Sequence, residues 1–233
     1  MRTLVIIPAF NEARAIASVI GDIPPGLVHE VVVVNNASTD ETETRAREAG
    51  ATVLRENRRG YGWACLCGIA YARSRNPDVI VFLDGDYSDH PDEMADIVGP
   101  ILGGVADIVI GSRMLGSRER GAMLPQAIWG NRLACFLIRL IWGTRYTDLG
   151  PFRAIRFTSL LDLDMQDRTF GWTIEMQIKA AIKGLRIMET PVSYRRRVGV
   201  SKITGTVSGT VMASLKILWT IFRFALQSWR RRK

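Results

Sequence analysis

The chain of 233 residues is long enough for one large domain or two small ones, and its hydrophobic content of 47% excludes a generally disordered protein. Its net charge of +8 is uneven, because residues 193–233 carry ten Lys or Arg and no Asp or Glu, whereas the remaining residues carry 21 basic and 23 acidic ones. The basic tail therefore favours an anionic partner, either nucleic acid or the cytoplasmic face of a membrane.

Short runs of Val, Ile and Leu alternate with helical segments through the first 115 residues. We expect Pro8 to end the first strand and Asn11 to cap the first helix. Apolar strands separated by helices are typical of a parallel sheet that is covered on both faces. The predicted strands are 3–7, 30–35, 51–56, 78–84 and 106–112, and the predicted helices are 11–22, 40–50, 62–74 and 91–102.

The second half of the chain is richer in long helices. Its last predicted helix places polar residues at three- and four-residue steps among Leu, Phe and Trp, and the sequence RRRK follows it. Such an amphipathic helix suits a membrane interface. The predicted helices are 125–142, 172–184 and 206–229, and the predicted strands are 150–156, 185–190 and 192–197.

No segment is typical of a secretory signal or a membrane span. The apolar run after Arg2 stops at Pro8, too early for the core of a signal, and no apolar run is long enough to cross a bilayer. The three cysteines lack the spacing of zinc or redox sites. We therefore expect reduced, structural thiols in a cytoplasmic protein.

A group of carboxylates follows the predicted strand at 78–84. Asp84 and Asp86 are two residues apart, so in an extended segment their side chains point to the same side. Like charges this close repel each other unless a cation holds them, and Asp89 adds a third. The carboxyl end of a strand is where open α/β sheets bind ligands, and two carboxylates suit Mg²⁺ or Mn²⁺. A solvated turn is the alternative interpretation of this short motif.

Polar clusters also follow three other predicted strands, at 8–12, 35–40 and 111–113. Helix capping explains part of the second cluster and Asn11, but it explains neither Glu12 nor Arg113. We therefore expect a single ligand crevice along this edge of the sheet.

The order of several short motifs resembles that of the family 2 glycosyltransferases, and more narrowly the polyprenyl- and dolichyl-phosphate sugar synthases. The motifs are VIIPAFNE, VVVVNNASTD, NRRGYG, FLDGDYSDHP, IGSR, GNRL, TDLGPFRAI, FGWTIEMQIKAAIKGL and YRRRVGVSKI. The resemblance implies a Rossmann-like GT-A domain at 1–203, with a nucleotide-sugar half (1–115) and an acceptor half (116–203). A basic amphipathic tail (204–233) follows it.

The resemblance also implies donor and metal sites. Asp84 and Asp86 would hold a metal on the donor diphosphate, Ser88 stands where the family often has a third ligand, and Asp89 would position the donor sugar or the metal. Asn35 and Asn36 stand where the family commonly has acidic residues that contact the base and ribose, which leaves the nucleotide open. The implied donor-binding residues are Pro8, Asn11, Glu12, Asn35, Asn36, Asp40, Gly60, Asp84, Gly85 and Arg113, and the implied catalytic residues are Asp84, Asp86, Asp89 and Arg113.

The implied acceptor-phosphate residues are Arg132, Arg196, Ser201 and Lys202. Arg195 and Arg197 are alternatives to Arg196. Glu175 interrupts an apolar helix, and it is either a general base for a hydroxyl acceptor or a member of a buried ion pair.

The implied reaction is metal-dependent transfer of a hexose, with inversion, from a UDP- or GDP-linked sugar to a polyprenyl or dolichyl phosphate. A lipid phosphate is already anionic, so it needs cations to position it rather than a general base. Helices 125–142 and 206–229 would lie at the membrane surface, although packing on the core or on a second subunit is an alternative.

Three other functions are consistent with parts of the sequence. They are transfer to a saccharide or small-molecule hydroxyl, nucleic-acid binding through the basic tail, and a scaffold without activity, which Asn35 and Asn36 would suit. The slightly acidic body and the Trp and Phe residues beside the cations of the tail favour a membrane over nucleic acid. Intact Asp84, Asp86 and Arg113 argue against a scaffold.

Overall fold

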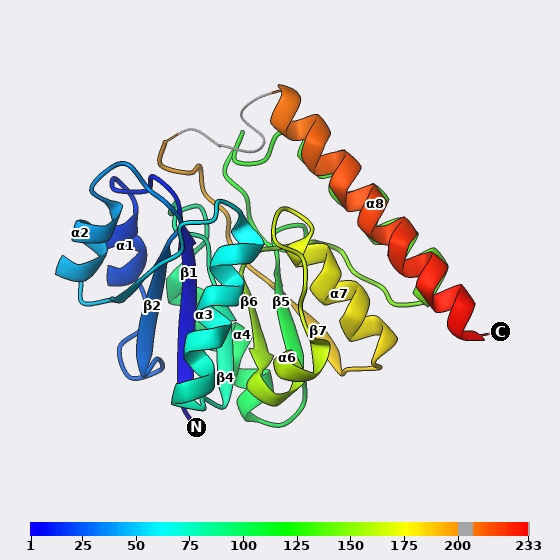
Figure 1. The fold of residues 1–233 in the computed structure, drawn as a ribbon, viewed down its shortest axis with the longest axis horizontal. Helices are drawn as coiled ribbons and strands as arrows, with labels where there is room; N and C mark the ends of the chain where they lie inside the picture. Colours follow the sequence, from blue (N-terminus) through cyan, green and yellow to red (C-terminus); the bar gives the residue numbers. More distant parts are fainter. Residues whose placement is uncertain (200–206, 233) are drawn as a thin grey trace.

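The computed structural model describes residues 1–199 and 207–232, which form a seven-stranded sheet between two layers of helices, with a long C-terminal helix at one side (Figure 1). The strand order is β3-β2-β1-β4-β6-β5-β7, and all neighbours are parallel except β6, which is antiparallel to β4 and β5. The strands are β1 (Thr3–Ala9), β2 (Glu30–Asn35), β3 (Thr52–Arg55), β4 (Val79–Phe82), β5 (Ile108–Ser112), β6 (Arg153–Arg156) and β7 (Ile187–Pro191).

Two apolar clusters cover the two faces of the sheet. Leu4 and Ile6 of β1 belong to one cluster, whereas Val5 and Ile7 belong to the other, because successive side chains of a strand point to opposite faces. This double burial explains why the strands are continuous apolar runs. The first cluster includes α3 (Tyr61–Arg75), α5 (Pro125–Trp142), α6 (Phe157–Leu163) and α7 (Trp172–Ile182), and the second includes α1 (Ile16–Gly21), α2 (Thr42–Glu48) and α4 (Met94–Leu102).

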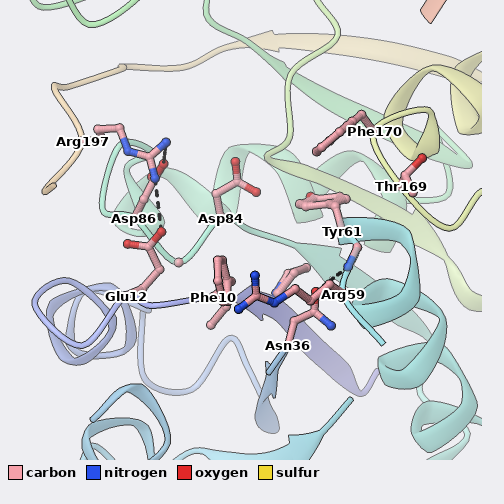
Figure 2. A pocket seen from close by; sticks show the side chains of 14 residues that line it. Phe10, Glu12, Asn36, Arg59, Tyr61, Asp84, Asp86, Thr169, Phe170 and Arg197 are labelled. Carbon is pink, nitrogen blue, oxygen red and sulfur yellow. Dashed lines mark hydrogen bonds and ion pairs between the residues drawn. The ribbon is translucent and has the colours of Figure 1, made fainter. Parts of the chain in front are cut away.

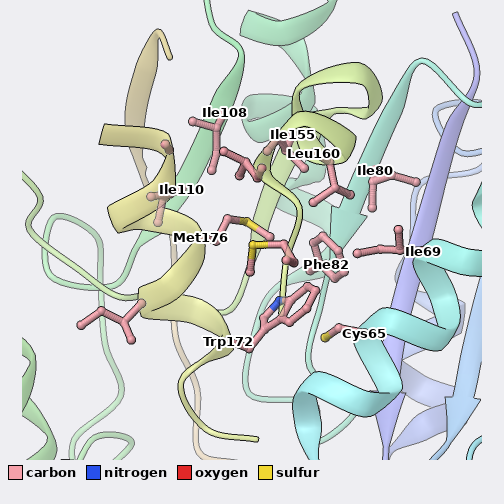
Figure 3. Close-up of a cluster of buried hydrophobic side chains, with 14 of the residues drawn as sticks. Cys65, Ile69, Ile80, Phe82, Ile108, Ile110, Ile155, Leu160, Trp172 and Met176 are labelled. Atoms are coloured by element: carbon pink, nitrogen blue, oxygen red, sulfur yellow. The ribbon is translucent and has the colours of Figure 1, made fainter. Parts of the chain in front are cut away.

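Trp172 anchors the first cluster (Figure 3). Its ring meets the ring of Phe82 edge-on, with 5.9 Å between the centroids. Phe82 is the last residue of β4, and Asp84 follows it two residues later. The packing of Trp172 therefore fixes the strand end that carries the predicted metal ligands.

Helix α8 (Val207–Arg232) packs on α5 and α7. Ile221 and Phe224 of α8 are buried in this contact. Lys216 of α8 forms an ion pair with Asp167 at 2.8 Å, and the indole of Trp142 donates a hydrogen bond to Ser228 at 3.1 Å. The outer face of α8 is exposed and apolar. Within the described part of the chain, no helix combines the length and apolarity that a membrane span requires.

The structure corrects three of the predicted elements and adds one helix. Strand β1 continues through Pro8 to Ala9, because its pairing with β4 stops at Ile6 and Phe82, so the missing N–H of Pro8 faces no ladder partner. Helix α1 begins only at Ile16, after a turn, and Asn11 does not cap it. Helix α6 was not predicted. Residues 192–197 form no strand, and Tyr194 makes isolated bridges to Asp89 and Arg118. The mostly parallel sheet that the resemblance implies is confirmed, with β6 as its antiparallel member.

Close packing joins the start of α3 to the loop before α7. A Cβ added at Gly62 would overlap the carbonyl oxygen of Asp167, and the backbone N–H of Trp63 donates to the carbonyl of Arg168 at 3.2 Å. Only a glycine allows this approach. The contact places residues 165–171 above the edge of the sheet.

We expect Gly62→Ala to lower the free energy of unfolding by about 1–3 kcal/mol, because the added methyl group overpacks this contact. Urea denaturation measures the change. Gly99→Ala in α4 is the matched control, since nothing lies within 4 Å of its added Cβ. The control should be neutral or more stable, because Ala is the better helix former. A Gly62→Ala protein as stable as the unmodified chain would contradict the prediction.

Candidate active site

A cavity of about 330 Å³ lies at the carboxyl edge of the sheet (Figure 2). Residues that follow β1, β2 and β4 form part of its wall, and the start of α3, the loop before α7 and Arg197 after β7 form the rest. The sequence predicts a ligand crevice at this edge. The predicted residues that line the cavity are Pro8, Glu12, Asn36, Gly60, Asp84, Gly85 and Asp86.

Asp84 occupies the wall between this cavity and a second one, and it lines both. Burial, and to a smaller extent the negative charge of Asp86, raise the pKa of Asp84 to about 7. The direction of this shift means that the folded chain disfavours the charged carboxylate in the absence of a cation.

Asp86 is held from two sides. The backbone N–H of Ser88 donates to Oδ1 of Asp86 at 2.9 Å, and the Ser88 hydroxyl also donates to this oxygen. The guanidinium of Arg197 lies 3.2 Å from Oδ2 of the same carboxylate. Ser88, which stands where the family often has a third metal ligand, therefore orients Asp86 in this structure.

Asp89 lies behind these two residues and is almost completely buried. Among the described residues, neither of its carboxylate oxygens has a hydrogen-bond partner. Burial and the charges of Asp84 and Asp86 raise its pKa well above the usual range. Asp89 does not line the cavity, so the structure gives it no direct contact with a ligand there.

These carboxylates fit a divalent cation that arrives with a diphosphate. Within the described ranges, no group of three or more His, Cys, Asp or Glu side chains forms a complete metal cage. Mg²⁺ and related ions are commonly held by one or two carboxylates, with substrate phosphates and water as the other ligands. The raised pKa of Asp84 and the unpartnered oxygens of Asp89 indicate a shortage of positive charge, even with the guanidinium of Arg197 beside Asp86.

The polar residues after β1 and β2 mainly hold one another. The backbone N–H of Thr39 donates to Oδ1 of Asn11 at 2.8 Å, and Asp40 accepts from the N–H of Thr42 at 3.0 Å. The side-chain amide of Asn35 donates to Glu43 at 3.1 Å. Asn11, Asn35 and Asp40 do not line the cavity, and in this structure they hold the loops beside it. Their contacts with the donor stay a prediction.

Sequence reasoning missed several residues of the cavity wall, namely Phe10, Arg59, Tyr61, Thr169 and Phe170. All of them lie within or next to the motifs PAFNE, NRRGYG and FGWTIEM. The guanidinium of Arg59 lies 4.5 Å from the ring centre of Phe10, and together they form a flat, cationic surface. The motifs were recognisable in the sequence, but the orientation of these side chains could not be predicted from it.

A second pocket of about 550 Å³ adjoins the first. Tyr61, Asp84, Phe170 and Arg197 line both pockets. Arg113 lies on the wall of the second pocket and not of the first, which places it on the side away from the predicted nucleotide site. Farther out, the walls are apolar and come from the start of α5 and from α8; they include Met123, Leu124, Ala127, Ala213 and Ile217.

Asp148 fixes the orientation of Arg113. The Nε and Nη2 atoms of Arg113 each lie 2.8 Å from a different oxygen of this fully buried carboxylate. The backbone N–H of Arg113 donates to the same carboxylate at 2.8 Å, and the ring of Tyr194 lies 5.0 Å from the guanidinium. Such a two-point contact holds a guanidinium in one orientation. Asp148 belongs to the motif TDLGPFRAI, but its role was not recognised from the sequence.

The structure separates the cations predicted to bind the acceptor phosphate. Arg132 is exposed beside Trp129 on α5 and lines neither pocket. Arg196 is exposed, and its guanidinium donates to the backbone carbonyl of Arg120 at 2.6 Å, whereas Arg197 points into both pockets. Arg197 therefore replaces Arg196 as the candidate. Ser201 and Lys202 lie outside the described residues.

Glu175 is completely buried and forms an ion pair with Lys179 at 2.8 Å. Its carboxylate also accepts from the backbone N–H groups of Gln166 and Asp167, at 3.0 and 2.6 Å. It lines neither of the two adjoining pockets. The geometry therefore supports the buried ion pair and not a general base.

Three relatives are similar to this chain over most of their length. An uncharacterized glycosyltransferase of Mycobacterium tuberculosis is 33% identical over 216 residues, which cover 91% of this chain and 94% of the relative. Undecaprenyl-phosphate mannosyltransferase of Micrococcus luteus is 30% identical over 230 residues, covering 92% and 93% of the two chains. Polyprenol monophosphomannose synthase of Mycolicibacterium smegmatis is 28% identical over 220 residues, covering 88% and 82%.

A solved structure and a family model agree with these relatives. Glucosyl-3-phosphoglycerate synthase from Mycobacterium tuberculosis, in complex with Mn²⁺, UDP-glucose and phosphoglyceric acid, superposes with a TM-score of 0.75 at 25% identity, covering 96% of this chain and 79% of that one. The model for glycosyl transferase family 2 matches residues 4–163. The GT-A fold that the motifs implied is confirmed. The chain is therefore a glycosyltransferase, and it belongs to glycosyl transferase family 2.

Proposed function

We propose that this enzyme transfers a hexose, with inversion, from a UDP- or GDP-linked sugar to a polyprenyl or dolichyl phosphate at the cytoplasmic surface of a membrane. The carrying observation is the pair of pockets that meet at Asp84, Tyr61, Phe170 and Arg197. The first pocket would take the nucleotide sugar and the second the lipid phosphate. The names of two relatives, which specify undecaprenyl phosphate and polyprenol as the lipid, support this choice of acceptor.

The second pocket has the chemistry that a lipid phosphate requires. Its inner end presents the guanidinium groups of Arg113 and Arg197, and its outer walls are mostly apolar. Guanidinium groups bind phosphate oxygens through charge-assisted hydrogen bonds, whereas an isoprenoid chain gains free energy only where apolar surface is removed from water. A pocket that combines both, in this order from the donor site outward, suits an acceptor with a charged head and an apolar tail.

The reaction needs no general base. An oxygen of the lipid phosphate forms the new bond to the anomeric carbon, and the bond from this carbon to the donor diphosphate breaks, so the electron pair leaves with the nucleoside diphosphate. Arg113, fixed by Asp148, would orient the attacking phosphate and offset its repulsion from the donor. Asp84 and Asp86 would hold Mg²⁺ or Mn²⁺, which would stabilise the charge of the leaving diphosphate.

Exposed apolar faces on α5 and α8 would bring the acceptor pocket to the bilayer. The two helices pack against each other, and both contribute walls of the second pocket. Arg132, Arg139, Arg223 and Arg230 lie among these apolar residues, as expected for helices in the plane of an anionic interface. The exposed apolar residues include Trp129, Leu133, Phe136 and Leu140 on α5 and Leu215, Trp219, Phe222 and Trp229 on α8.

A panel of UDP- and GDP-linked sugars, with radiolabelled hexose, polyprenyl phosphate and Mg²⁺ or Mn²⁺, tests the proposed reaction. We expect one donor to give labelled lipid, and we expect Asp86→Asn to reduce this transfer at least about 100-fold, because the leaving diphosphate loses its cation. Asp92→Asn, an exposed carboxylate that lines neither pocket, is the control. Label transferred only to phosphoglyceric acid or another hydroxyl compound would instead support the alternative acceptor class.

We expect Arg113→Lys to weaken binding of the lipid phosphate and to leave binding of the nucleotide donor unchanged. Lysine keeps the charge but cannot reach both oxygens of Asp148, so the cation is no longer held in one orientation. We expect the KM for the lipid to rise about tenfold, the worth of one charge-assisted hydrogen bond, with unchanged affinity for UDP or GDP. Arg186→Lys is the matched control, since Arg186 forms the same two-point contact with Asp107 away from both pockets. An equal loss of nucleotide affinity would contradict the assignment.

Vesicle flotation tests the membrane surface. We expect the double variant Trp219→Ala and Phe222→Ala to bind vesicles that contain anionic lipid at least about tenfold more weakly, because two exposed aromatic side chains no longer enter the interface. Val105→Ala removes an equally exposed apolar side chain outside α5 and α8 and should leave binding unchanged. Equal binding by the double variant and the unmodified enzyme would show that α8 does not contact the membrane.

A further inference from the structure

Arg197 lines both pockets and therefore lies at their junction. Figure 2 shows its guanidinium beside Asp86 and Glu12. Its Nη1 atom lies 3.2 Å from Oδ2 of Asp86, and its Nη2 atom lies 3.2 Å from Oε1 of Glu12. Ser88 already donates to Oδ1 of Asp86. The guanidinium therefore lies at Oδ2 of Asp86, whereas Ser88 holds Oδ1. A divalent cation would bind to Oδ2, because Oδ1 already accepts from Ser88.

The backbone around Arg197 is fixed to the same loop that carries Asp86. The N–H of Val198 donates to the carbonyl of Asp86, and the N–H of Arg195 donates to the carbonyl of Ser88, both at 2.9 Å. Among the described residues, the buried Nε of Arg197 has no hydrogen-bond partner. The side chain thus has an unused donor, and it can change partners by rotation while its backbone stays in place.

We infer that Arg197 is the counter-ion of Asp86 until a divalent cation binds, and that its guanidinium then passes to a phosphate group at the junction of the two pockets. This inference rests on the proposed metal site. A guanidinium and a divalent cation repel each other, so they do not share one carboxylate oxygen at contact distance. Glu12 keeps its contact with the other side of the guanidinium, which limits the movement, and phosphate oxygens match the guanidinium fork as a carboxylate does.

The phosphate belongs either to the nucleoside diphosphate or to the lipid, because Arg197 lines both pockets. In either case the movement of Arg197 sets the order of binding, with the metal before the phosphate. Without the metal, Arg197 neutralises Asp86 and is withheld from the substrates. With the metal bound, the same cation becomes available for phosphate, so the metal and the phosphate bind cooperatively.

Titration of the full chain with Mn²⁺, followed by the electron paramagnetic resonance signal of the free ion, tests the exchange. In the absence of substrates we expect Arg197→Gln to bind Mn²⁺ about three- to tenfold more tightly than the unmodified enzyme, because the competing cation is gone. Arg196→Gln is the matched control, since Arg196 is the adjacent residue and its side chain is exposed. Its Mn²⁺ affinity should not change.

Arg197→Gln should strengthen the binding of Mn²⁺ but weaken the binding of a phosphate ligand. With saturating Mn²⁺, we expect Arg197→Gln to bind either UDP or farnesyl phosphate about tenfold more weakly, as one lost charge-assisted contact would give. Weaker binding of UDP alone assigns the contact to the donor, and weaker binding of farnesyl phosphate alone assigns it to the acceptor. Unchanged binding of both overturns the inference.

Two further variants separate this inference from the proposed function. If Asp86→Asn abolishes Mn²⁺ binding but Arg197→Gln leaves it unchanged, the exchange is wrong and the proposed metal site stands. If Asp86→Asn binds Mn²⁺ normally, both are wrong. Should Arg197→Gln fail to fold, Arg197→Met replaces it: it keeps an extended side chain but carries no charge, so Mn²⁺ affinity should still rise, and an unchanged affinity would overturn the inference.

Discussion

Negative charge at the end of β4 is the constraint on which the rest of the site depends. Asp84, Asp86 and Asp89 lie within six residues of one another at the edge of a sheet that is covered on both faces. The pKa of Asp84 is raised, and Asp86 forms an ion pair with Arg197. The buried carboxylate oxygens of Asp89 have no hydrogen-bond partner among the described residues. A fold tolerates such a group only when cations come from elsewhere in the chain or from a ligand. The negative charge of the site is therefore only partly neutralised by the chain, and a divalent cation would supply the missing positive charge.

The sheet topology brings the compensating cations to this edge. Strand β7 is parallel to β5, so Arg113, after β5, and Arg197, after β7, emerge at the same end of the sheet. Strand β6 runs the opposite way, and the residues that precede it therefore also lie there. This reversal is what places Asp148 beside Arg113. A fully parallel sheet would put the start of β6 at the other edge, and Arg113 would have no buried partner.

The sequence predicted the fold where its signals are local. Apolar strands, the bounds of α5 and the carboxylates after β4 were all recognisable, because burial on both faces and a strand end leave a pattern in consecutive residues. The antiparallel direction of β6 was not predictable in this way, and neither was the fact that Arg197, and not Arg196, points into the pockets. Both depend on contacts between segments far apart in the chain, such as the one between Val198 and Asp86. Neighbouring arginines in an irregular segment carry no periodicity that would say which one points inward.

Asn36 shows how such long-range contacts give a physical reason for a departure from the family pattern. Its side-chain amide donates to the carbonyls of Glu56 and Arg58, at 3.1 and 2.7 Å, and its Oδ1 accepts from the N–H of Gly60 at 2.8 Å. A carboxylate has no N–H to donate and would face those two carbonyls with like charge. In this chain the asparagine therefore holds the loop that presents Arg59 and Tyr61 to the cavity. The amide that suggested an inactive scaffold is thus part of the structure that builds this wall of the cavity.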